Sequence, residues 1–211
     1  MNPQLLVLAS GTFGQDVARR LAHGTGTSRR EVTLMEIDEG THPSLWPHAD
    51  VIVLATSQER PHLFEATDRA AFAWRVPWLG VYPTATEMRC GPVVIPGRTA
   101  CYECYARRRN QHRRPDPGTT SPENDRYPTG YPEHHVGIAA ALARQAIEEA
   151  LGTAPDDEQA LGGTVRSFDQ VTGATSRASV VAVDRCARCR TRVGSEELWR
   201  QLATIDEGRT A

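Results

Sequence analysis

Four of the five cysteines stand in two identically spaced pairs, CYEC at residues 101–104 and CARC at residues 186–189. Two C-x-x-C pairs can form disulfides, act as redox dithiols, or bind one tetrahedral metal ion through four thiolates. The first residues, MNPQLLVLAS, do not have the pattern of a signal peptide, so we expect a reducing compartment, which disfavours disulfides. The presence of two pairs disfavours a simple redox motif. A structural Zn²⁺ site is therefore predicted, with four unrelated buried thiols as the alternative. The predicted ligands are Cys101, Cys104, Cys186 and Cys189.

The remaining chemistry-bearing side chains form no comparable set. Cys90 stands alone and is expected to be structural, while His134 and His135 precede a predicted helix and are expected in its first turn. No Ser/His/Asp or Cys/His arrangement has a spacing typical of nucleophilic catalysis. All 24 basic residues are arginine, so any mechanism that needs a lysine ammonium group from this chain is excluded.

The N-terminal half alternates between strand and helix patterns. LLVLASGTFGQDVARRLA reads as a buried strand, a glycine turn and a helix, and EVTLMEID as a second strand. ADVIVLAT (49–56) and PWLGVYPT read as further strands, separated by the helix RPHLFEATDRAAFAWRV, with Pro61 in its first turn. This alternation predicts the α/β class: a Rossmann-like, mostly parallel sheet flanked by helices.

The second half predicts a different arrangement. Residues 107–133 are rich in proline and poor in aliphatic residues, which is typical of a mobile loop. HVGIAAALARQAIEEALG has an apolar helical face with Gly152 as its C-terminal cap. GGTVRSFDQVTGATSRASVVAVDR reads as an antiparallel strand pair around a TG turn. We expect one domain over residues 1–192, followed by a short helix and tail over 193–211.

The overall composition narrows the class of protein. A chain of 211 residues with net charge −2 predicts one soluble domain with no general bias toward nucleic acid or membranes. No stretch is long and apolar enough to span a bilayer. We therefore expect a cytoplasmic protein.

Several of these motifs follow one another in an order that also occurs in a known protein family. The glycine turn near the N-terminus, ADVIVLAT, GPVVIPGRTACYEC, an alanine-rich helix after a loop, and the terminal CARC resemble the ThiF/MoeB superfamily, relatives of ubiquitin-activating enzymes. The resemblance covers most of residues 5–192. It implies a Rossmann-like fold, a homodimer, a zinc held by four cysteines and, in active members, adenylation of a peptide or protein C-terminus with Mg-ATP.

The sequence departs from the active pattern where catalysis occurs. The phosphate turn has lost its first glycine and reads Ala9-Ser-Gly11-Thr-Phe-Gly14, and the family's arginine-bearing segment and lysine are missing. The magnesium-binding aspartate aligns near Ser57. Without these groups the charge of ATP is not compensated, so ATP binding is not expected. The positions of a vestigial nucleotide site are Gly11, Gly14, Glu36 and Asp38, the two acids being a ribose contact or simply a solvated strand end.

One branch of the superfamily resembles this pattern of losses. It comprises the leader-peptide-binding or ThiF-like partner proteins of YcaO-type cyclodehydratases, in the biosynthesis of thiazole/oxazole-modified peptides. The resemblance implies a non-adenylating accessory subunit, dimeric or in a hetero-complex, that binds or presents a precursor peptide to the YcaO enzyme. Since the chain starts at the Rossmann strand, we expect leader binding on another surface or a separate peptide-recognition protein.

The arginine run ARRRNQHRR is a candidate for contact with an acidic peptide or partner. A solvated loop is the plain alternative, and nucleic acid is disfavoured because the run lacks interleaved aromatic residues. The candidate residues are Arg107, Arg108, Arg109, Arg113 and Arg114.

Two rival functions remain open from the sequence. A minimal adenylyltransferase would act on a sulfur-carrier or peptide C-terminus and contact phosphates through arginines such as Arg19, Arg20 or Arg60. A zinc-stapled nucleotide or redox sensor would use the Rossmann pocket without catalysis.

Overall fold

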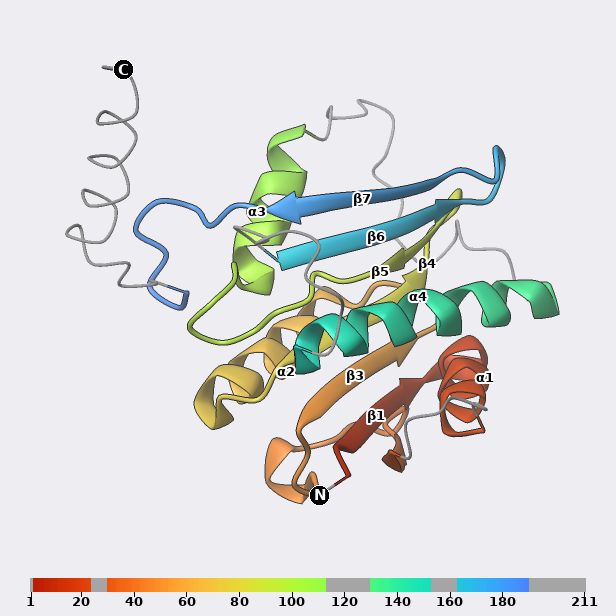
Figure 1. The fold of residues 1–211 in the computed structure, drawn as a ribbon, viewed down its shortest axis with the longest axis horizontal. Coiled ribbons are helices and arrows are strands. Elements are labelled where there is room, and N and C mark those ends of the chain that lie inside the picture. Colours follow the sequence, from red (N-terminus) through yellow and green to blue (C-terminus); the bar gives the residue numbers. More distant parts are fainter. Residues whose placement is uncertain (1, 24–29, 113–129, 153–162, 190–211) are drawn as a thin grey trace, which may run out of the picture.

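The computed structural model describes residues 2–23, 30–112, 130–152 and 163–189. Within these residues, seven strands form one sheet in the order β2-β1-β3-β4-β5-β6-β7, with four α-helices packed against it (Figure 1). The strands are β1 (Gln4–Ser10), β2 (Glu31–Glu36), β3 (Val51–Thr56), β4 (Trp78–Pro83), β5 (Glu87–Cys90), β6 (Gly163–Asp169) and β7 (Thr175–Val180). The helices are α1 (Gly11–Ala22), α2 (Pro61–Trp74), α3 (Tyr102–His112) and α4 (Glu133–Leu151), and Pro43–Leu45 form a short 3-10 helix.

The first four strands form the parallel half of the sheet. β1 lies between β2 and β3, and β3 lies between β1 and β4. β3 is buried along its whole length, and β1 along all but its first residue. Strands covered on both faces read as continuous apolar runs, which explains the sequences LLVLA and VIVLA.

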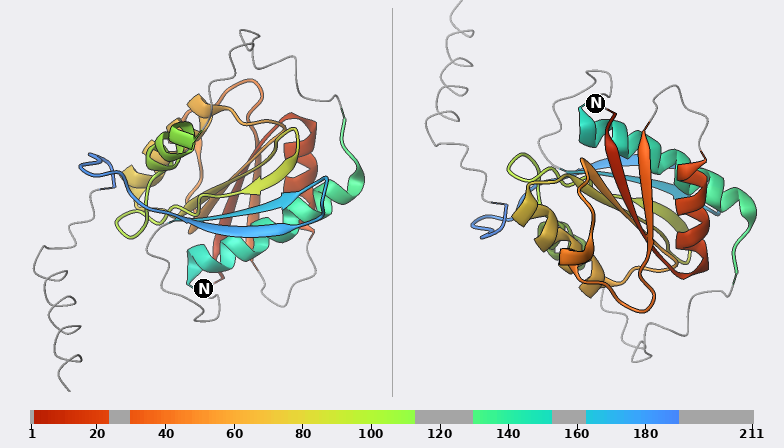
Figure 2. Two further views of the ribbon diagram at one scale, coloured as in Figure 1. Left: turned by 90° about the horizontal axis from the view of Figure 1, so that it is seen from above. Right: turned by 90° about the horizontal axis from the view of Figure 1, so that it is seen from below.

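Helices cover both faces of this half. α1 and α4 lie on one face, and α2 and α3 lie on the other (Figure 2). On the first face Phe13 of α1 and Ile147 of α4 belong to one core, and on the second Phe64 of α2 and Tyr102 of α3 belong to another. The predicted helix from Pro61 is confirmed, with the proline in its first turn.

The other half of the sheet is antiparallel. β5 pairs with β4 and β6, and β6 pairs with β7. The predicted C-terminal strand pair is confirmed, and Gly173, with φ of +73°, lies in the turn between its strands. β5 was not predicted, since a four-residue strand that contains an arginine gives a weak pattern. The α/β class and the helix-flanked sheet are confirmed.

Residues 107–112 correct the loop predicted over 107–133. They form the last part of α3, which runs from Tyr102 to His112. The helix tolerates its arginines because Arg107 forms an ion pair with Glu103 one turn earlier, and Arg109 forms one with Glu59 after β3 (2.7 Å). The remainder of that loop up to residue 129 and the helix expected over 193–211 lie outside the described residues.

The predicted alanine-rich helix is confirmed as α4. Its C-terminal cap is Gly152 in the left-handed conformation, as the sequence predicts, and His134 and His135 lie in its first turn. None of the helices within the described ranges is both long enough and apolar enough to cross a bilayer.

Candidate metal centre and the carboxyl edge of the parallel sheet

The four paired cysteines come together at one buried point. Cys101 immediately precedes α3 and Cys104 lies in its first turn, while Cys186 and Cys189 lie in the segment that follows β7. All four sulfur atoms lie within 4.8 Å of one another. The Sγ atoms of Cys101 and Cys186 are 3.6 Å apart, and those of Cys104 and Cys189 are 3.4 Å apart. The predicted cluster is therefore confirmed.

The arrangement of the sulfurs fits a tetrahedral metal ion. Zn–S bonds of about 2.3 Å place the sulfurs of a zinc tetrathiolate about 3.8 Å apart, close to the two pair distances. Burial opposes ionisation of Cys186, but N–H groups of Cys189 and Arg188 that donate to its sulfur lower the pKa of this thiol to about 7. Burial raises the pKa of Cys101 and Cys189, so thiolates there need a cation beside them. Four protein ligands leave no open coordination position, which indicates a structural rather than a catalytic centre.

Cys90 is a different kind of cysteine. It is fully buried at the end of β5, and burial raises the pKa of its thiol to about 12. A thiol in this state is a weak nucleophile, in agreement with the structural role expected for Cys90.

An ion-pair cluster that the sequence did not reveal supports the metal centre. Arg188, between the last two cysteines, contacts Asp68 of α2 (Nη1 to Oδ2, 2.6 Å) and Glu65 one turn earlier (Nη1 to Oε2, 3.0 Å). Asp68 also accepts hydrogen bonds from Trp78 Nε1 (2.9 Å) and from the backbone N–H of Tyr102 (3.3 Å). Burial raises the pKa of Asp68, and these donors oppose that shift. The cluster ties α2, β4 and the start of α3 to the CARC segment.

The glycines of the β1–α1 turn serve a close approach to β3. Gly11 has φ of +70°, and a Cβ atom there would lie 2.3 Å from Ser57 Oγ. A Cβ atom on Gly14 would lie 2.3 Å from the carbonyl oxygen of Ala55. The close contacts at both positions, and the positive φ at Gly11, are sufficient reasons for glycine without any bound nucleotide.

The beginning of α1 is occupied by side chains of this chain. Asp38 Oδ1 accepts hydrogen bonds from the backbone N–H of Gly11 (2.7 Å) and from Ser10 Oγ (2.8 Å), and its Oδ2 accepts one from Gln15 Nε2 (3.2 Å). Ser57 Oγ accepts the N–H of Phe13 (3.1 Å). Asp38 is exposed to solvent, as expected of a strand end, but its carboxylate is also bound to the start of α1, whereas Glu36, which ends β2, is exposed.

This geometry bears on nucleotide binding. N-terminal N–H groups of a helix are the usual donors to a phosphate, and here a carboxylate and a hydroxyl accept two of them. A phosphate at the same place would have to displace the carboxylate of Asp38 and would meet its negative charge.

The candidate arginines separate into distinct environments. Arg107 and Arg108 are exposed on α3, and Arg108 Nη2 donates to the carbonyl of Ala182 (3.4 Å). Arg109 faces inward, its side chain only 16% exposed, and contacts Glu59 and the hydroxyl of Tyr82 (3.3 Å). Arg109 is thus largely withdrawn from the contact surface expected of it, because it pairs with Glu59, whose side chain is only 10% exposed. Arg113 and Arg114 lie outside the described residues.

The arginines named for a minimal adenylyltransferase are not grouped at the phosphate turn. Arg19 and Arg20 lie in the last turn of α1, about 12 Å along the helix axis from Gly11. Arg19 forms an ion pair with Asp16. Arg60 stands at the N-cap of α2.

A cluster of tyrosines, also missed from the sequence, lies at the carboxyl ends of β3 and β4, with Tyr82 as the next-to-last residue of β4. The hydroxyl of Tyr102 donates to Glu59 Oε1 (3.0 Å), and those of Tyr82 and Tyr105 lie 3.5 Å apart. In open α/β sheets ligands bind outside the carboxyl ends of the strands. In this chain α3 places Tyr102, Tyr105 and Arg109 over that region.

Comparison with solved structures gives matches of fold. The structure of the heterocyclase TruD matches 95% of this chain and 28% of its own, with a TM-score of 0.63 and 19% identity. The microcin C7 biosynthetic enzyme MccB in complex with N-formylated MccA matches 89% of this chain and 67% of its own, with a TM-score of 0.60 and 16% identity. E. coli MccB with ATP gives a TM-score of 0.57 and 15% identity, covering 89% of this chain and 66% of that one.

The chain has the fold found in TruD and MccB. It spans less than a third of the length of TruD, and at these identities the likeness is one of architecture. No protein-family model matches the chain, and no curated protein sequence matches it.

Proposed function

We propose that this chain is a non-adenylating, ThiF-like partner protein in the biosynthesis of ribosomally made peptides. It binds or presents a precursor peptide to a YcaO-type cyclodehydratase, which carries out the ATP-dependent chemistry. The fold shared with a heterocyclase and with a microcin biosynthetic enzyme supports this class of pathway.

The observation that carries the non-adenylating part is the contact between Asp38 and the turn before α1. The carboxylate accepts the Gly11 N–H at 2.7 Å, where an ATP-binding turn would offer that donor to phosphate. The chain has no lysine, and Ser57 follows β3 where active members carry the magnesium-binding aspartate. A site that lacks these charges and holds its own anion is poorly suited to Mg-ATP.

The four-cysteine centre has a structural part in this proposal. Cys101, Cys104, Cys186 and Cys189 would hold Zn²⁺, which supplies a fixed connection between the start of α3 and the segment after β7. The body of the protein would thereby present a stable surface to its partners.

Calorimetry with Mg-ATP tests the proposal directly. E. coli MccB, whose structure was solved with ATP, is the positive control. We expect no heat and no ATP-dependent pyrophosphate exchange at concentrations that detect a Kd of about 1 mM, a binding free energy of about −4 kcal/mol. Binding together with pyrophosphate exchange would instead identify an adenylyltransferase.

The partner role requires a second measurement. We expect this chain to co-purify with a YcaO-type enzyme encoded beside it and to raise heterocycle formation on a precursor peptide, followed by the loss of 18 Da per ring in mass spectrometry. A YcaO enzyme that works equally well without this chain would contradict the proposed role.

A further inference from the structure

β7 forms one end of the sheet, with β6 as its neighbour on one side (Figure 1). Asp169 N–H donates to the carbonyl of Ala174, directly opposite (2.8 Å), whereas the carbonyl of Thr164, opposite Ser179, accepts from Val93 (2.8 Å). Because bonded and non-bonded pairs alternate in an antiparallel ladder, Thr175 and Ser179 turn their N–H and C=O groups away from β6. These are the backbone groups that an added strand would use.

The side chains of β7 leave room for another strand. Every residue from Thr175 to Ser179 is exposed, whereas Val180 is buried in the core beneath α3. Ser176 and Ala178 share the face of Val180, since side chains alternate along a strand. Both side chains are small, so neither projects far over the edge of the strand.

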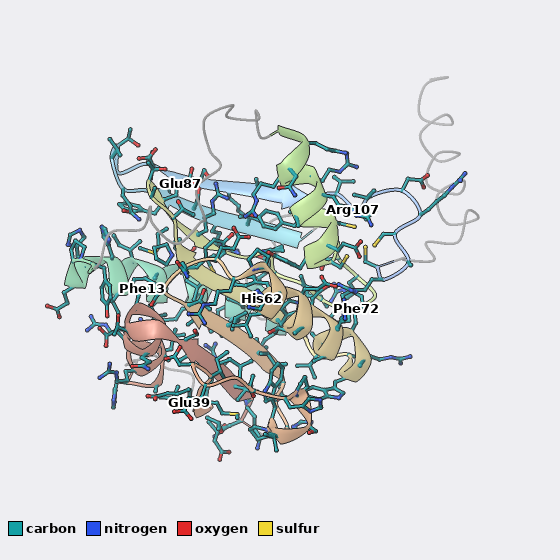
Figure 3. The ribbon with its side chains drawn as sticks, turned by 180° about the vertical axis from the view of Figure 1, so that it is seen from behind. Phe13, Glu39, His62, Phe72, Glu87 and Arg107 are labelled. Atoms are coloured by element: carbon teal, nitrogen blue, oxygen red, sulfur yellow. The ribbon has the colours of Figure 1, made fainter. Side chains whose placement is uncertain are left out.

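Basic side chains near β7 determine which net charge a bound peptide should have. α3 carries two exposed arginines: Arg107, which also pairs with Glu103 one turn earlier, and Arg108, which reaches the carbonyl of Ala182 just after β7. Figure 3 shows Arg107 on α3 beside the loop that follows β7. The exposed charges of that loop, Asp184 and Arg185, pair with each other at 3.5 Å, so the basic character of this side comes from α3.

The opposite edge of the sheet has the contrary charge. β2 begins with Glu31 and ends with Glu36, both exposed, and Glu39 follows close behind. An acidic peptide is therefore attracted to β7 and repelled from β2.

The cysteine centre connects α3 to the segment that directly follows β7. Cys104 lies in the first turn of α3, and Cys186 follows β7 after only five intervening residues. The N–H of Val183 also donates to Cys104 Sγ (3.2 Å). The arginines of α3 are thus held at a constant distance from the strand edge.

We propose that β7 binds an extended acidic peptide segment as an eighth strand, whose carboxylates contact Arg107 and Arg108. Main-chain hydrogen bonds would come from Thr175 and Ser179, and the arginines would supply the preference for acidic sequences. If the bound segment is part of the precursor peptide, that identification rests on the proposed function. The binding of an acidic peptide at β7 does not depend on the proposed function.

Two substitutions of Ser179 distinguish binding through its backbone N–H from binding through its side chain. Ser179→Pro removes an N–H that points away from β6 and so leaves the β6–β7 ladder intact, while Ser179→Ala keeps that N–H. The probe is a fluorescein-labelled ten-residue peptide of alternating threonine and glutamate, with a threonine–lysine peptide as the charge control. Binding is measured by fluorescence anisotropy at low and high salt.

We expect wild-type protein and Ser179→Ala to bind the threonine–glutamate probe equally, and Ser179→Pro to bind it at least about tenfold more weakly. The double variant Arg107→Glu/Arg108→Glu should lose a similar factor, and it carries the test if circular dichroism shows that Ser179→Pro does not fold. Binding should weaken as salt rises.

Other results would overturn the inference. These are undiminished binding by folded Ser179→Pro, equal binding of the threonine–lysine probe, or no binding to the wild type. A dimer that Ser179→Pro converts to a monomer, without peptide binding in either, would show that a second copy of the chain occupies the edge. Because the assay contains no YcaO enzyme, failure of the partner role leaves its outcome unchanged.

Discussion

Replacement of Arg188 by methionine tests whether the CARC segment is held by charge as well as by metal. The change removes the guanidinium group that contacts Asp68 and Glu65 and keeps an unbranched side chain. The side chain of Asp68 is 0% exposed, so its carboxylate would lose its only charged partner among the described contacts. Removing one partner of a buried ion pair costs about 3–5 kcal/mol. Since Trp78 and the N–H of Tyr102 still donate to Asp68, we expect the lower end, about 3 kcal/mol.

Urea unfolding of the metal-loaded protein, followed by circular dichroism, measures this cost. With a slope of about 3 kcal/mol per molar urea, the midpoint should fall by about 1 M. Arg185→Met is the matched control, because Arg185 lies in the same segment, is 84% exposed and pairs with the exposed Asp184 at 3.5 Å. That control should change stability by less than about 0.5 kcal/mol.

A double variant distinguishes loss of the ion pair from loss of packing. Asp68→Asn combined with Arg188→Met removes the unpaired buried charge and should recover part of the lost stability. The reasoning is refuted if Arg188→Met behaves like Arg185→Met, or if the double variant is less stable than Arg188→Met alone.

Three further experiments, two of them with a control variant, test the metal centre and the start of α1. Cys189→Ser should abolish zinc binding measured by atomic absorption, whereas Cys90→Ala should retain it; equal zinc content in both would contradict the assigned ligands. Asp38→Asn should lower thermal stability by about 1 kcal/mol through its weaker acceptance of N–H groups at the start of α1, and an unchanged melting temperature would argue against that contact. Gly14→Ala should destabilise by about 2 kcal/mol, because its Cβ meets a β3 carbonyl, whereas Gly137→Ala in α4, whose Cβ meets nothing within 4 Å, should stabilise by about 0.5–1 kcal/mol. The same sign for both glycines would be the contrary result.

The elements with strong local patterns were predictable from the sequence. β1 and β3 are continuous apolar runs because both faces are covered, and the end of α4 is marked by Gly152. The clustering of the four cysteines was predictable because two equal cysteine spacings have few chemical explanations.

The features that escaped prediction depend on partners distant in the sequence. α3 is helical despite its arginines because Arg109 meets Glu59, fifty residues earlier, and β5 is a strand because β4 and β6 flank it. Asp38 reads as a plain strand end until the turn before α1 is seen to donate to it. No local pattern marks Arg188 within its C-x-x-C pair, because its carboxylate partners lie more than a hundred positions away.

The cysteine centre also has a consequence for how the chain folds. It joins residues 85 positions apart, so assembly closes a loop that includes α3, α4, β6 and β7. Loop closure of this length carries an entropic cost that metal coordination offsets, and ligand binding to the native state alone raises its population. Zinc that binds this centre in the native state would therefore raise the population of folded chains.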